Sequence, residues 1–436
     1  MVRPSSKRHL DVWMNGRRVG DYSASTKTGI SFQYDPDWLS NGFAVSRQLP
    51  MTDRIQRGDA VAAVFENLLP DNTDLRRKLA ERTEARSARP HDLLSVIGRD
   101  CVGAMQFVPR GEDPGDPFAY DSSSQTDAQI ADTLRSLATS PLGMRDGEPF
   151  RISLAGAQEK TAYFRKDGTW HRPLGMTPTT HIFKRPMGVV SQHIDMSDSV
   201  ENEYLCLRLT RFLGLPVNDA AIGTFEDQKA LIVTRFDRRA RQSDGRLLRM
   251  PQEDFLQAMG LDSAQKYQEH GGPNFEDCAA LTKGSAAREN DMGMLVKAQV
   301  VFWLLQATDG HAKNFSIEML KDGYRMTPLY DILSAAPHDA SGGLRAKDIR
   351  MAISVGDKRR YRMDQIHPRH FAQSAARAGI PPHVFNQAVT ELAERGHHAI
   401  NAAATDLPES IPDRVASPIL ELAKNRMHIL QDFVSA

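Results

Sequence analysis

The sequence predicts an α+β fold, with most strands before residue 255 and most helices after it. Three observations support this expectation. Polar and apolar residues alternate in many short stretches of the first half, which is the period of a half-buried strand. From about residue 291 onward, the apolar positions recur mainly with the helical period. The chain has 436 residues, of which 40% are hydrophobic and 25% charged, enough for two or three domains with sizeable cores.

Residues 1–110 are predicted to form a small mixed N-terminal domain. Asn15-Gly16 stands between two alternating runs, and this is the strongest short signal for a β-hairpin. The elements expected here are strands at 9–14, 17–22, 29–34 and 102–108 and helices at 61–69 and 74–88. The helix at 74–88 is rich in arginine. A solvated helix face is the simpler interpretation, and contact with nucleic acid is the alternative.

Residues 111–150 are predicted to be a linker with one short helix at 127–137, because Gly, Pro, Asp and Ser dominate the first part. Residues 151–255 then alternate strands, turns and one helix, and residues 256–436 are mainly helical. The elements expected between 151 and 255 are strands at 151–154, 162–165, 181–184, 220–224 and 230–236 and a helix at 199–213. The basic run 235–241 is predicted to be a strand end and an exposed turn.

The most informative stretch follows the apolar run 300–305. It contains Asp309, His311 and Asn314, and Asp331 lies 17 residues after the asparagine. In protein kinases an Asp accepts the proton of the substrate hydroxyl, and an Asn five residues later holds a metal ion. A further Asp, placed after a strand, holds Mg²⁺ between the phosphates. The spacing alone is a weak signal, since Asp and Asn are also ordinary turn residues.

Other residues fit the same chemistry. Lys184 ends an apolar strand ahead of a helix, as does the kinase lysine that contacts the α- and β-phosphates. Glu201 and Glu203 are candidates for its ion-pair partner, whereas a strand-edge lysine that discourages aggregation is the alternative. The small-residue turn 155–161 lies where a phosphate-covering loop belongs. Its single glycine matches neither glycine-rich phosphate motif, so a tight hairpin is the alternative.

Several polar residues keep two interpretations. His311 either contacts phosphate or orders the turn, and Lys313 either neutralises the γ-phosphate or is exposed. The basic run 357–362 surrounds Tyr361 with cations; it either meets an acidic substrate or nucleic acid, or forms a charged surface turn. Taken together, the order of strands and helices and the placed acids predict a two-lobed, protein-kinase-like core whose C-terminal lobe is mainly helical.

Charge and cysteine content exclude some classes of protein. Lys and Arg number 55, as do Asp and Glu, so the zero net charge argues against a surface that binds polyanions as a whole. Cys101, Cys206 and Cys278 are scattered, which is typical of a reducing compartment and gives no metal-ligand spacing. The first residues lack the apolar core of a signal peptide, and no apolar run approaches the roughly 18 residues of a membrane span. We therefore expect a cytoplasmic protein without membrane contact.

Several different motifs are distributed along most of the chain. They are 152–161 (ISLAGAQEKT), 181–184, 251–255, 307–316 (ATDGHAKNFS), 327–332, and, in the N-terminal part, 65–71 and 98–104. In content and order they resemble the motifs of HipA-type serine/threonine kinase toxins. The resemblance implies an enzyme that uses ATP and Mg²⁺ and belongs to a bacterial toxin–antitoxin pair. It also implies a HipB-like helix-turn-helix antitoxin as partner, with operator DNA reached mainly through that antitoxin. The family's substrate class is an aminoacyl-tRNA synthetase, typically glutamyl-tRNA synthetase, whose phosphorylation stops translation and favours dormancy and persistence.

The resemblance also assigns residues. It implies that Asp309 is the general base, that Lys184 contacts the phosphates, and that Asn314 and Asp331 hold Mg²⁺. We count His311 with Asp309 and Lys184 among the catalytic residues. Ser153 matches the serine that the family autophosphorylates, which ejects the phosphate-covering loop and silences the kinase. The implied ATP contacts are Ala155, Gly156, Ala157, Gln158, Glu159, Lys160, Lys184, Glu253, Asp254, Phe255, His311 and Asn314.

Two alternatives stay open at this point. One is a catalytically weak binding module that acts as an antitoxin-associated corepressor. The other is a small-molecule or lipid kinase, because the order Thr308-Asp309-Gly310-His311 departs from ordinary protein kinases and is closer to phosphoinositide-kinase-like loops.

Overall fold

The computed structural model describes residues 7–27, 29–144, 152–156, 158–191 and 194–436. The chain divides into two compact units. Unit 1 consists of residues 1–185, 223–264 and 317–323, and unit 2 of residues 186–222, 265–316 and 324–436. The mixture of helices and sheets confirms the predicted α+β class. The predicted domain boundaries after residues 110, 150 and 255 stay a prediction, because each unit is assembled from separate stretches of chain.

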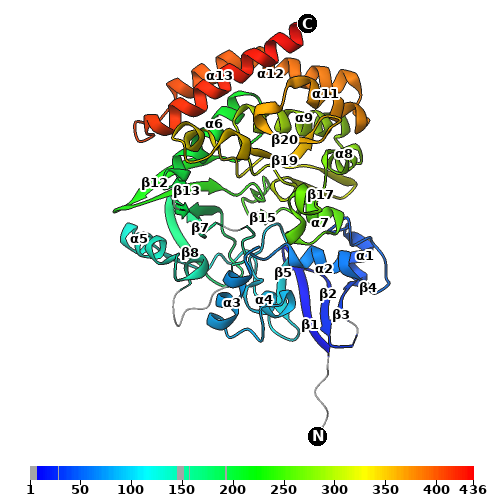
Figure 1. Cartoon of the computed structure of the whole chain (residues 1–436). Coiled ribbons are helices and arrows are strands. Elements are labelled where there is room, and N and C mark those ends of the chain that lie inside the picture. The colour runs from blue at the N-terminus through cyan, green and yellow to red at the C-terminus, as the bar shows by residue number, and fades with distance from the viewer. Residues whose placement is uncertain (1–6, 28, 145–151, 157, 192–193) are drawn as a thin grey trace. The chain divides into compact units, whose positions relative to one another are not determined.

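The N-terminal part of unit 1 is a five-stranded antiparallel sheet with helices against it (Figure 1). Its elements are β1 (Lys7–Met14), β2 (Arg17–Ser25), β3 (Gly29–Tyr34), α1 (Pro36–Asn41), β4 (Gln56–Arg57), α2 (Asp59–Glu66), α3 (Thr73–Arg82), α4 (Pro90–Ile97) and β5 (Gln106–Pro109). The strand order is β4-β3-β2-β1-β5. Asn15 and Gly16 turn the predicted hairpin with φ of 49° and 81°, the left-handed conformation that an Asn-Gly turn favours.

The arginine-rich helix is shorter than predicted. The chain leaves α3 after Arg82, and Glu84 has a left-handed φ of 54° that a helix does not accommodate. A new helix, α4, starts with Pro90, whose fixed φ suits a first helical position. Arg76 is buried and pairs with Glu66, so not every arginine of this helix faces solvent.

The second sheet of unit 1 has the strand order β12-β13-β9-β7-β8-β6. Its strands are β6 (Ser122–Ser124), β7 (Lys160–Lys166), β8 (Thr169–Pro173), β9 (His181–Lys184), β12 (Ala220–Phe225) and β13 (Gln228–Thr234). The predicted linker therefore contributes an edge strand, β6, as well as α5 (Asp127–Ser136), which a Thr126–Gln129 capping box starts. The strand predicted at 151–154 is wrong within the described residues: Ile152 makes one isolated bridge to Asp100, and Arg151 lies outside them.

The prediction of an exposed turn at 235–241 is wrong at its start, because a buried ion cluster forms there. Asp100 and Asp237 share the side chains of Arg235 and Arg238, and Asp100 also pairs with Arg249. All five side chains are at most 4% exposed. Asp237 also accepts the Gly103 N–H at 2.7 Å. The cluster thereby ties the loop after α4 to the chain that follows β13. The remaining elements of unit 1 include β14 (Arg238–Ala240), β15 (Leu247–Arg249), β16 (Gln252–Asp254), α7 (Phe255–Met259) and most of β17 (Ser316–Leu320).

Unit 2 is mainly helical, as predicted, and α9 (Arg288–Leu304) lies at its centre. α9 is buried on nearly every face and packs against four other helices, α8 (Phe275–Lys283), α11 (Pro368–Arg377), α12 (Pro382–Thr405) and α13 (Asp413–Ser435). α12 and α13 lie side by side (Figure 1). The other elements are β10 (Gly188–Ser191), β11 (Ile194–Met196), α6 (Ser199–Phe212), most of β18 (Gly323–Met326), α10 (Ala336–Ala340), β19 (Arg350–Val355), β20 (Arg360–Arg362) and the short 3-10 helices η3 (Gln268–His270), η4 (Ala312–Asn314), η5 (Ala346–Asp348) and η6 (Met363–Gln365). No helix of the described residues is both long and apolar enough to cross a bilayer.

Candidate active site

The loop that carries Asp309 begins where α9 ends. Gln306 leaves the helix with a left-handed φ of 54°, and its carbonyl oxygen accepts the N–H of Ala335 at 2.9 Å. Ala307 and Ser334 form an antiparallel bridge. These bonds join the loop of Asp309 directly to the segment that follows Asp331, so the two predicted acids of unit 2 share one framework.

Helix α6 supports the same framework from the other side. The side chain of Asn202 donates to the Ser334 carbonyl oxygen and accepts the Ser334 N–H, both at 2.8 Å. Such a paired side-chain contact imitates a strand bridge and holds the backbone in one register. Because Asn202 is buried, losing this pair would leave backbone polar groups unsatisfied.

Asp309 is fixed at its backbone and on one side of its carboxylate. Its carbonyl oxygen accepts the N–H of His311 at 2.8 Å and Nδ2 of Asn314 at 2.5 Å. Oδ1 accepts the hydroxyl of Tyr267 and lies 3.5 Å from Nε2 of His311. The side chain is 46% exposed, and within the described residues no donor contacts Oδ2. This second oxygen is therefore available to a ligand.

Gly310 allows the tight approach of this loop to α9. A Cβ at this position would lie 2.4 Å from the ring of Phe302, closer than real atoms come. The glycine between Asp309 and His311 is therefore required by packing against a buried aromatic ring.

His311 is buried beneath the acid. Its side chain is 3% exposed, and its ring meets that of Tyr267 edge-on with centroids 4.9 Å apart. Burial lowers the pKa of His311, although the nearby Asp309 opposes this shift. The imidazole is thus neutral at neutral pH, and its burial favours the role of ordering the loop over direct contact with phosphate. Lys313 is buried as well, so of its two alternatives simple solvent exposure is wrong.

Tyr330 connects the chain segments of the predicted metal ligands, Asn314 and Asp331. The hydroxyl of Tyr330 donates to the Lys313 carbonyl oxygen at 3.0 Å and lies 2.5 Å from the Ser316 hydroxyl. Asp331 follows it with a left-handed φ of 60°, an uncommon conformation for a non-glycine residue and one enriched at functional sites.

The donor chemistry of this pair fits Mg²⁺. Since Nδ2 of Asn314 is spent on Asp309, its Oδ1 is the atom left for a cation. An amide oxygen and a carboxylate are hard donors, and Mg²⁺ in phosphoryl-transfer enzymes takes its other ligands from phosphate and water. The described residues contain no group of three or more His, Cys, Asp or Glu side chains suited to a metal.

Unit 1 carries the predicted phosphate-contacting lysine. Lys184 ends β9, is 7% exposed, and pairs in register with Lys160 of β7. Directly paired residues of antiparallel strands point to the same face, so the two ammonium groups share one face of the sheet. Glu201 and Glu203 are both buried on α6 in unit 2, and their pairing with Lys184 stays a prediction.

The predicted phosphate-covering loop has the geometry of a close backbone approach. Gly156 has a φ of 99°, and a Cβ there would lie 2.7 Å from Nζ of Lys160. Gln158 donates to the Arg185 carbonyl oxygen at 3.1 Å, and Glu159 pairs with the Arg185 side chain at 3.1 Å. Only glycine therefore suits position 156. Ala155 precedes this turn, and Ala157 lies outside the described residues.

Ser153 is entirely buried in unit 1. Its N–H donates to the Asp100 carbonyl oxygen at 3.0 Å, and its hydroxyl donates to the Leu68 carbonyl oxygen at 2.7 Å. Its neighbours Ile152 and Leu154 belong to the apolar core of the N-terminal sheet. The segment must leave this position before the hydroxyl can be modified.

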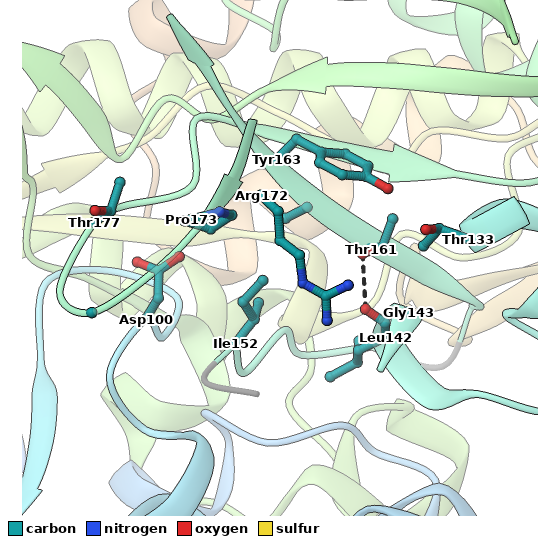
Figure 2. Close-up of a pocket in the computed structure, with 12 residues that line it drawn as sticks. Asp100, Thr133, Leu142, Gly143, Ile152, Thr161, Tyr163, Arg172, Pro173 and Thr177 are labelled. Atoms are coloured by element: carbon teal, nitrogen blue, oxygen red, sulfur yellow. Dashed lines mark hydrogen bonds between the residues drawn. The ribbon is translucent and has the colours of Figure 1, made fainter. Parts of the chain in front are cut away.

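A small cavity of about 30 Å³ adjoins this segment (Figure 2). Its lining includes Asp100, Ile152 and Thr161, and Figure 2 shows the guanidinium of Arg172 between Ile152 and Leu142. The volume suits one or two water molecules and is far too small for a nucleotide. Within the described residues, no predicted ATP contact lines it.

The predicted adenine contacts, 253–255, have local structural partners in unit 1. Oε1 of Glu253 accepts the Arg47 N–H at 2.9 Å, and burial raises the pKa of Glu253 to about 7. Asp254 caps α7 by accepting the Gln257 N–H at 2.9 Å, and Phe255 is fully buried. Contact of this segment with adenine stays a prediction.

Sequence reasoning missed Tyr267, Tyr330 and Asn202, which hold the loop of Asp309 and the turn of Asp331. Tyr330 lies within the motif 327–332 but received no role, and Tyr267 and Asn202 lie in none of the motifs. In the basic run 357–362, residues 357–359 form an exposed turn and residues 360–362 form the half-buried strand β20, where Arg350 lies over the ring of Tyr361 at 5.2 Å. That geometry suits the surface-turn interpretation and leaves its ligand alternatives untested.

The sequence matches two family models in tandem. Residues 10–108 match the HipA N-terminal domain, and residues 152–400, more than half of the chain, match the HipA-like C-terminal domain. Over 405 residues the chain is 31% identical to Y4mE of Sinorhizobium fredii, whose name proposes kinase activity, with 92% of each protein covered. Over 412 residues it is 27% identical to the serine/threonine-protein kinase toxin HipA of Shewanella oneidensis, covering 92% of this chain and 89% of that protein.

A solved structure agrees at the level of the fold. In the Shewanella oneidensis complex of HipA, HipB and operator DNA, one chain matches with a TM-score of 0.80 at 24% identity. The match covers 98% of this chain and 99% of that one.

Proposed function

The chain belongs to the HipA-like family of serine/threonine kinase toxins of toxin–antitoxin systems, and we propose that it transfers the γ-phosphoryl group of ATP to a serine or threonine of a protein. One observation carries the proposal. The carboxylate of Asp309 is anchored through a single oxygen, and hydrogen bonds tie its loop to Asn314 and to the turn of Asp331. A base, two hard-oxygen ligands and their supports thus form one framework.

Asp309 performs the proton transfer in this mechanism. Its Oδ2 accepts the proton of the acceptor hydroxyl, whose oxygen forms the new bond to the γ-phosphorus. The bond from that phosphorus to the bridging oxygen breaks, and ADP leaves. Asn314 and Asp331 would hold Mg²⁺, which when bound would offset the charge of the phosphate oxygens. Neutral His311 keeps the loop in place from beneath.

The residues that we propose as phosphate contacts belong to unit 1. The paired lysines, Lys160 and Lys184, offer two ammonium groups on one face of the sheet. Because Gly156 has no Cβ, Nζ of Lys160 lies close to its backbone, which supports placing this turn at the phosphates. The segment 253–255 contacts adenine. These residues support ATP as the phosphoryl donor, and the family supports a protein acceptor over the lipid or small-molecule acceptor that the order Thr308-Asp309-Gly310-His311 left open.

We also propose that Ser153 is phosphorylated by the enzyme itself. A phosphoserine carries about −1.5 to −2 charge at neutral pH and has no hydroxyl proton to donate. Ser153 is fully buried and donates to the Leu68 carbonyl oxygen. The modified side chain does not fit this site, so the segment would stay outside it, which changes the adjoining phosphate-covering loop.

The proposed partner is a small HipB-like helix-turn-helix antitoxin that contacts operator DNA. Support comes from the structural relative, which is part of a complex with HipB and operator DNA. The proposed substrate is an aminoacyl-tRNA synthetase, with the glutamyl enzyme as the first candidate. Phosphorylation would stop charging of its tRNA, halt translation and favour dormancy.

The test combines labelled ATP with phosphoproteomics. The purified protein is incubated with γ-labelled ATP, Mg²⁺ and a lysate of its host, beside the Asp309→Asn variant. We expect label on a synthetase and on Ser153 with the unmodified protein and none with the variant. Equal labelling by both proteins would contradict the assigned base. No label on any protein would favour the corepressor alternative, and label on lipid or sugar would favour a small-molecule kinase.

A further inference from the structure

Tyr267 contacts the proposed base, yet no sequence motif singles it out. It lies immediately before η3, half-buried in unit 2, and its hydroxyl donates to Oδ1 of Asp309. The ring rests edge-on against His311, and the ammonium of Lys266 lies 5.5 Å above it. These neighbours orient the ring as well as the hydroxyl.

The segment around Tyr267 is itself fixed to the body of unit 2. Its carbonyl oxygen accepts the N–H groups of His270 and Gly272, both at 3.0 Å. The side chain of Gln268 accepts the N–H of Ser354, on β19, at 2.8 Å. Glu269 pairs with Arg350 at the start of the same strand. The phenol is therefore held in a position from which its hydroxyl donates to Asp309.

Two independent restraints then determine where the carboxylate points. The backbone oxygen of Asp309 is held by His311 and Asn314, which fixes the start of the side chain. Tyr267 holds Oδ1 at the far end. A carboxylate fixed at its root and at one oxygen has its second oxygen in a defined place, and such positioning is a large part of phosphoryl-transfer catalysis.

We propose that Tyr267 is a positioning residue, which holds Oδ1 of Asp309 so that Oδ2 faces the acceptor hydroxyl. This inference rests on the proposed function. In the transfer step the hydroxyl proton passes to Oδ2, the acceptor oxygen bonds to the γ-phosphorus, and ADP departs. Tyr267 keeps its own proton throughout and only donates a hydrogen bond.

The kinetic test uses Tyr267→Phe, which removes the hydroxyl and keeps the ring against His311. Hydrogen bonds to charged groups are worth about 1.5–3 kcal/mol, so we expect kcat to fall roughly 10- to 100-fold. The KM for ATP should stay within about twofold, because positioning acts on the transition state and not on nucleotide binding.

A matched control is Tyr324→Phe, since Tyr324 donates to the Leu281 carbonyl oxygen at 2.9 Å elsewhere in unit 2. This change also removes a buried phenol hydrogen bond, and kcat should stay near the unmodified value. An unchanged or raised kcat in Tyr267→Phe would overturn the inference, and a raised one would indicate that the phenol obstructs the acceptor. A parallel loss of kcat and of ATP affinity would reduce Tyr267 to a structural support and would overturn it too.

A spectroscopic test keeps the inference separate from the proposed function. The chain has 9 tyrosines, and labelling of their ζ-carbons with ¹³C gives one NMR signal for each. The Tyr267 signal is the one absent in Tyr267→Phe. It should shift in Asp309→Asn and stay in place in Asp432→Asn, an exposed acid on α13. A shifted signal in a protein without kinase activity would refute the function and retain the contact, whereas an unshifted signal would refute the contact.

Discussion

Asp100 of unit 1 and Asp309 of unit 2 are held in opposite ways. The Asp100 side chain is 4% exposed, and both of its oxygens are engaged. Oδ1 accepts from Arg238 at 2.9 Å and Arg249 at 3.0 Å, while Oδ2 accepts the Thr179 N–H and hydroxyl at 3.0 and 2.6 Å. The Asp309 side chain is 46% exposed, and among the residues that the structure describes its carboxylate is held through Oδ1 alone.

The charges around the two acids differ as well. Burial alone would raise the pKa of Asp100, but Arg238 and Arg249 overcome it and hold that pKa well below its usual range. Burial lowers the pKa of Arg249 to about 10 against the pull of Asp100. Both oxygens of Asp100 are occupied by donors of the protein, so this carboxylate can stabilise the fold but has no oxygen left for a proton or a ligand. Asp309 has an available oxygen and can accept a proton. The difference assigns a structural role to Asp100 and a catalytic role to Asp309.

The largest expected effect belongs to Asp309→Asn. The general base contributes about 10²- to 10⁴-fold to rate, so kcat for phosphoryl transfer should fall by that factor. The urea midpoint of unfolding should stay unchanged, because the amide still accepts from Tyr267. Asp432→Asn makes the same chemical change at an exposed site and should retain full activity. A large loss of unfolding free energy in Asp309→Asn would show that Asp309 stabilises the fold as Asp100 does, and would contradict the comparison.

Asp100→Asn should show the reverse pattern. Removing one partner from a buried ion cluster costs about 3–5 kcal/mol, which a urea titration of the unfolding free energy measures. Asp244→Asn, which breaks an exposed pair with Arg241, is the control and should leave the midpoint in place. Unchanged stability of Asp100→Asn would show that the saturated cluster is dispensable.

Glu253 sharpens the comparison, since it is buried like Asp100 but has one unsatisfied oxygen like Asp309. Burial raises the pKa of Glu253 from 4.5 to about 7. Between these values the folded protein keeps a proton that the unfolded chain has lost, so the unfolding free energy should fall as the pH rises, by about 3 kcal/mol in all. Glu253→Gln should flatten this slope. A slope that persists in the variant would assign it to another group.

Ser153→Ala should have the smallest effect. It removes one buried hydrogen bond, to the Leu68 carbonyl oxygen, and should lower the unfolding free energy by about 1 kcal/mol. Phosphoryl transfer to the protein substrate should continue, and autophosphorylation at this position should cease in a phosphopeptide map. Label that persists at another serine of the same peptide would contradict the assignment of Ser153 as the modified residue.

Local signals explain what the sequence predicted. Asn15-Gly16 dictates its own turn, and Asp309 and Asn314 contact each other across five residues. The positive φ of Asp331 and the close packing of Gly310 against Phe302 constrain these loops. Neither constraint can be predicted from the local sequence, because each depends on the folded backbone.

Distance along the chain explains what the sequence did not predict. Arg238 was expected on an exposed turn because its acid, Asp100, lies 138 positions away. Tyr267 stands 42 positions before Asp309 and carries no pattern of its own. A side chain whose partner is remote has no periodicity or spacing by which to be found, even where it is decisive for the site.

The most direct test measures two quantities on the same two variants. The rate of Mg²⁺-dependent phosphoryl transfer from ATP and the free energy of unfolding are determined for Asp309→Asn and Asp100→Asn, at a temperature where both are folded. The account predicts a crossed result, with Asp309→Asn inactive and stable, and Asp100→Asn active and less stable. Full transfer by Asp309→Asn would contradict it.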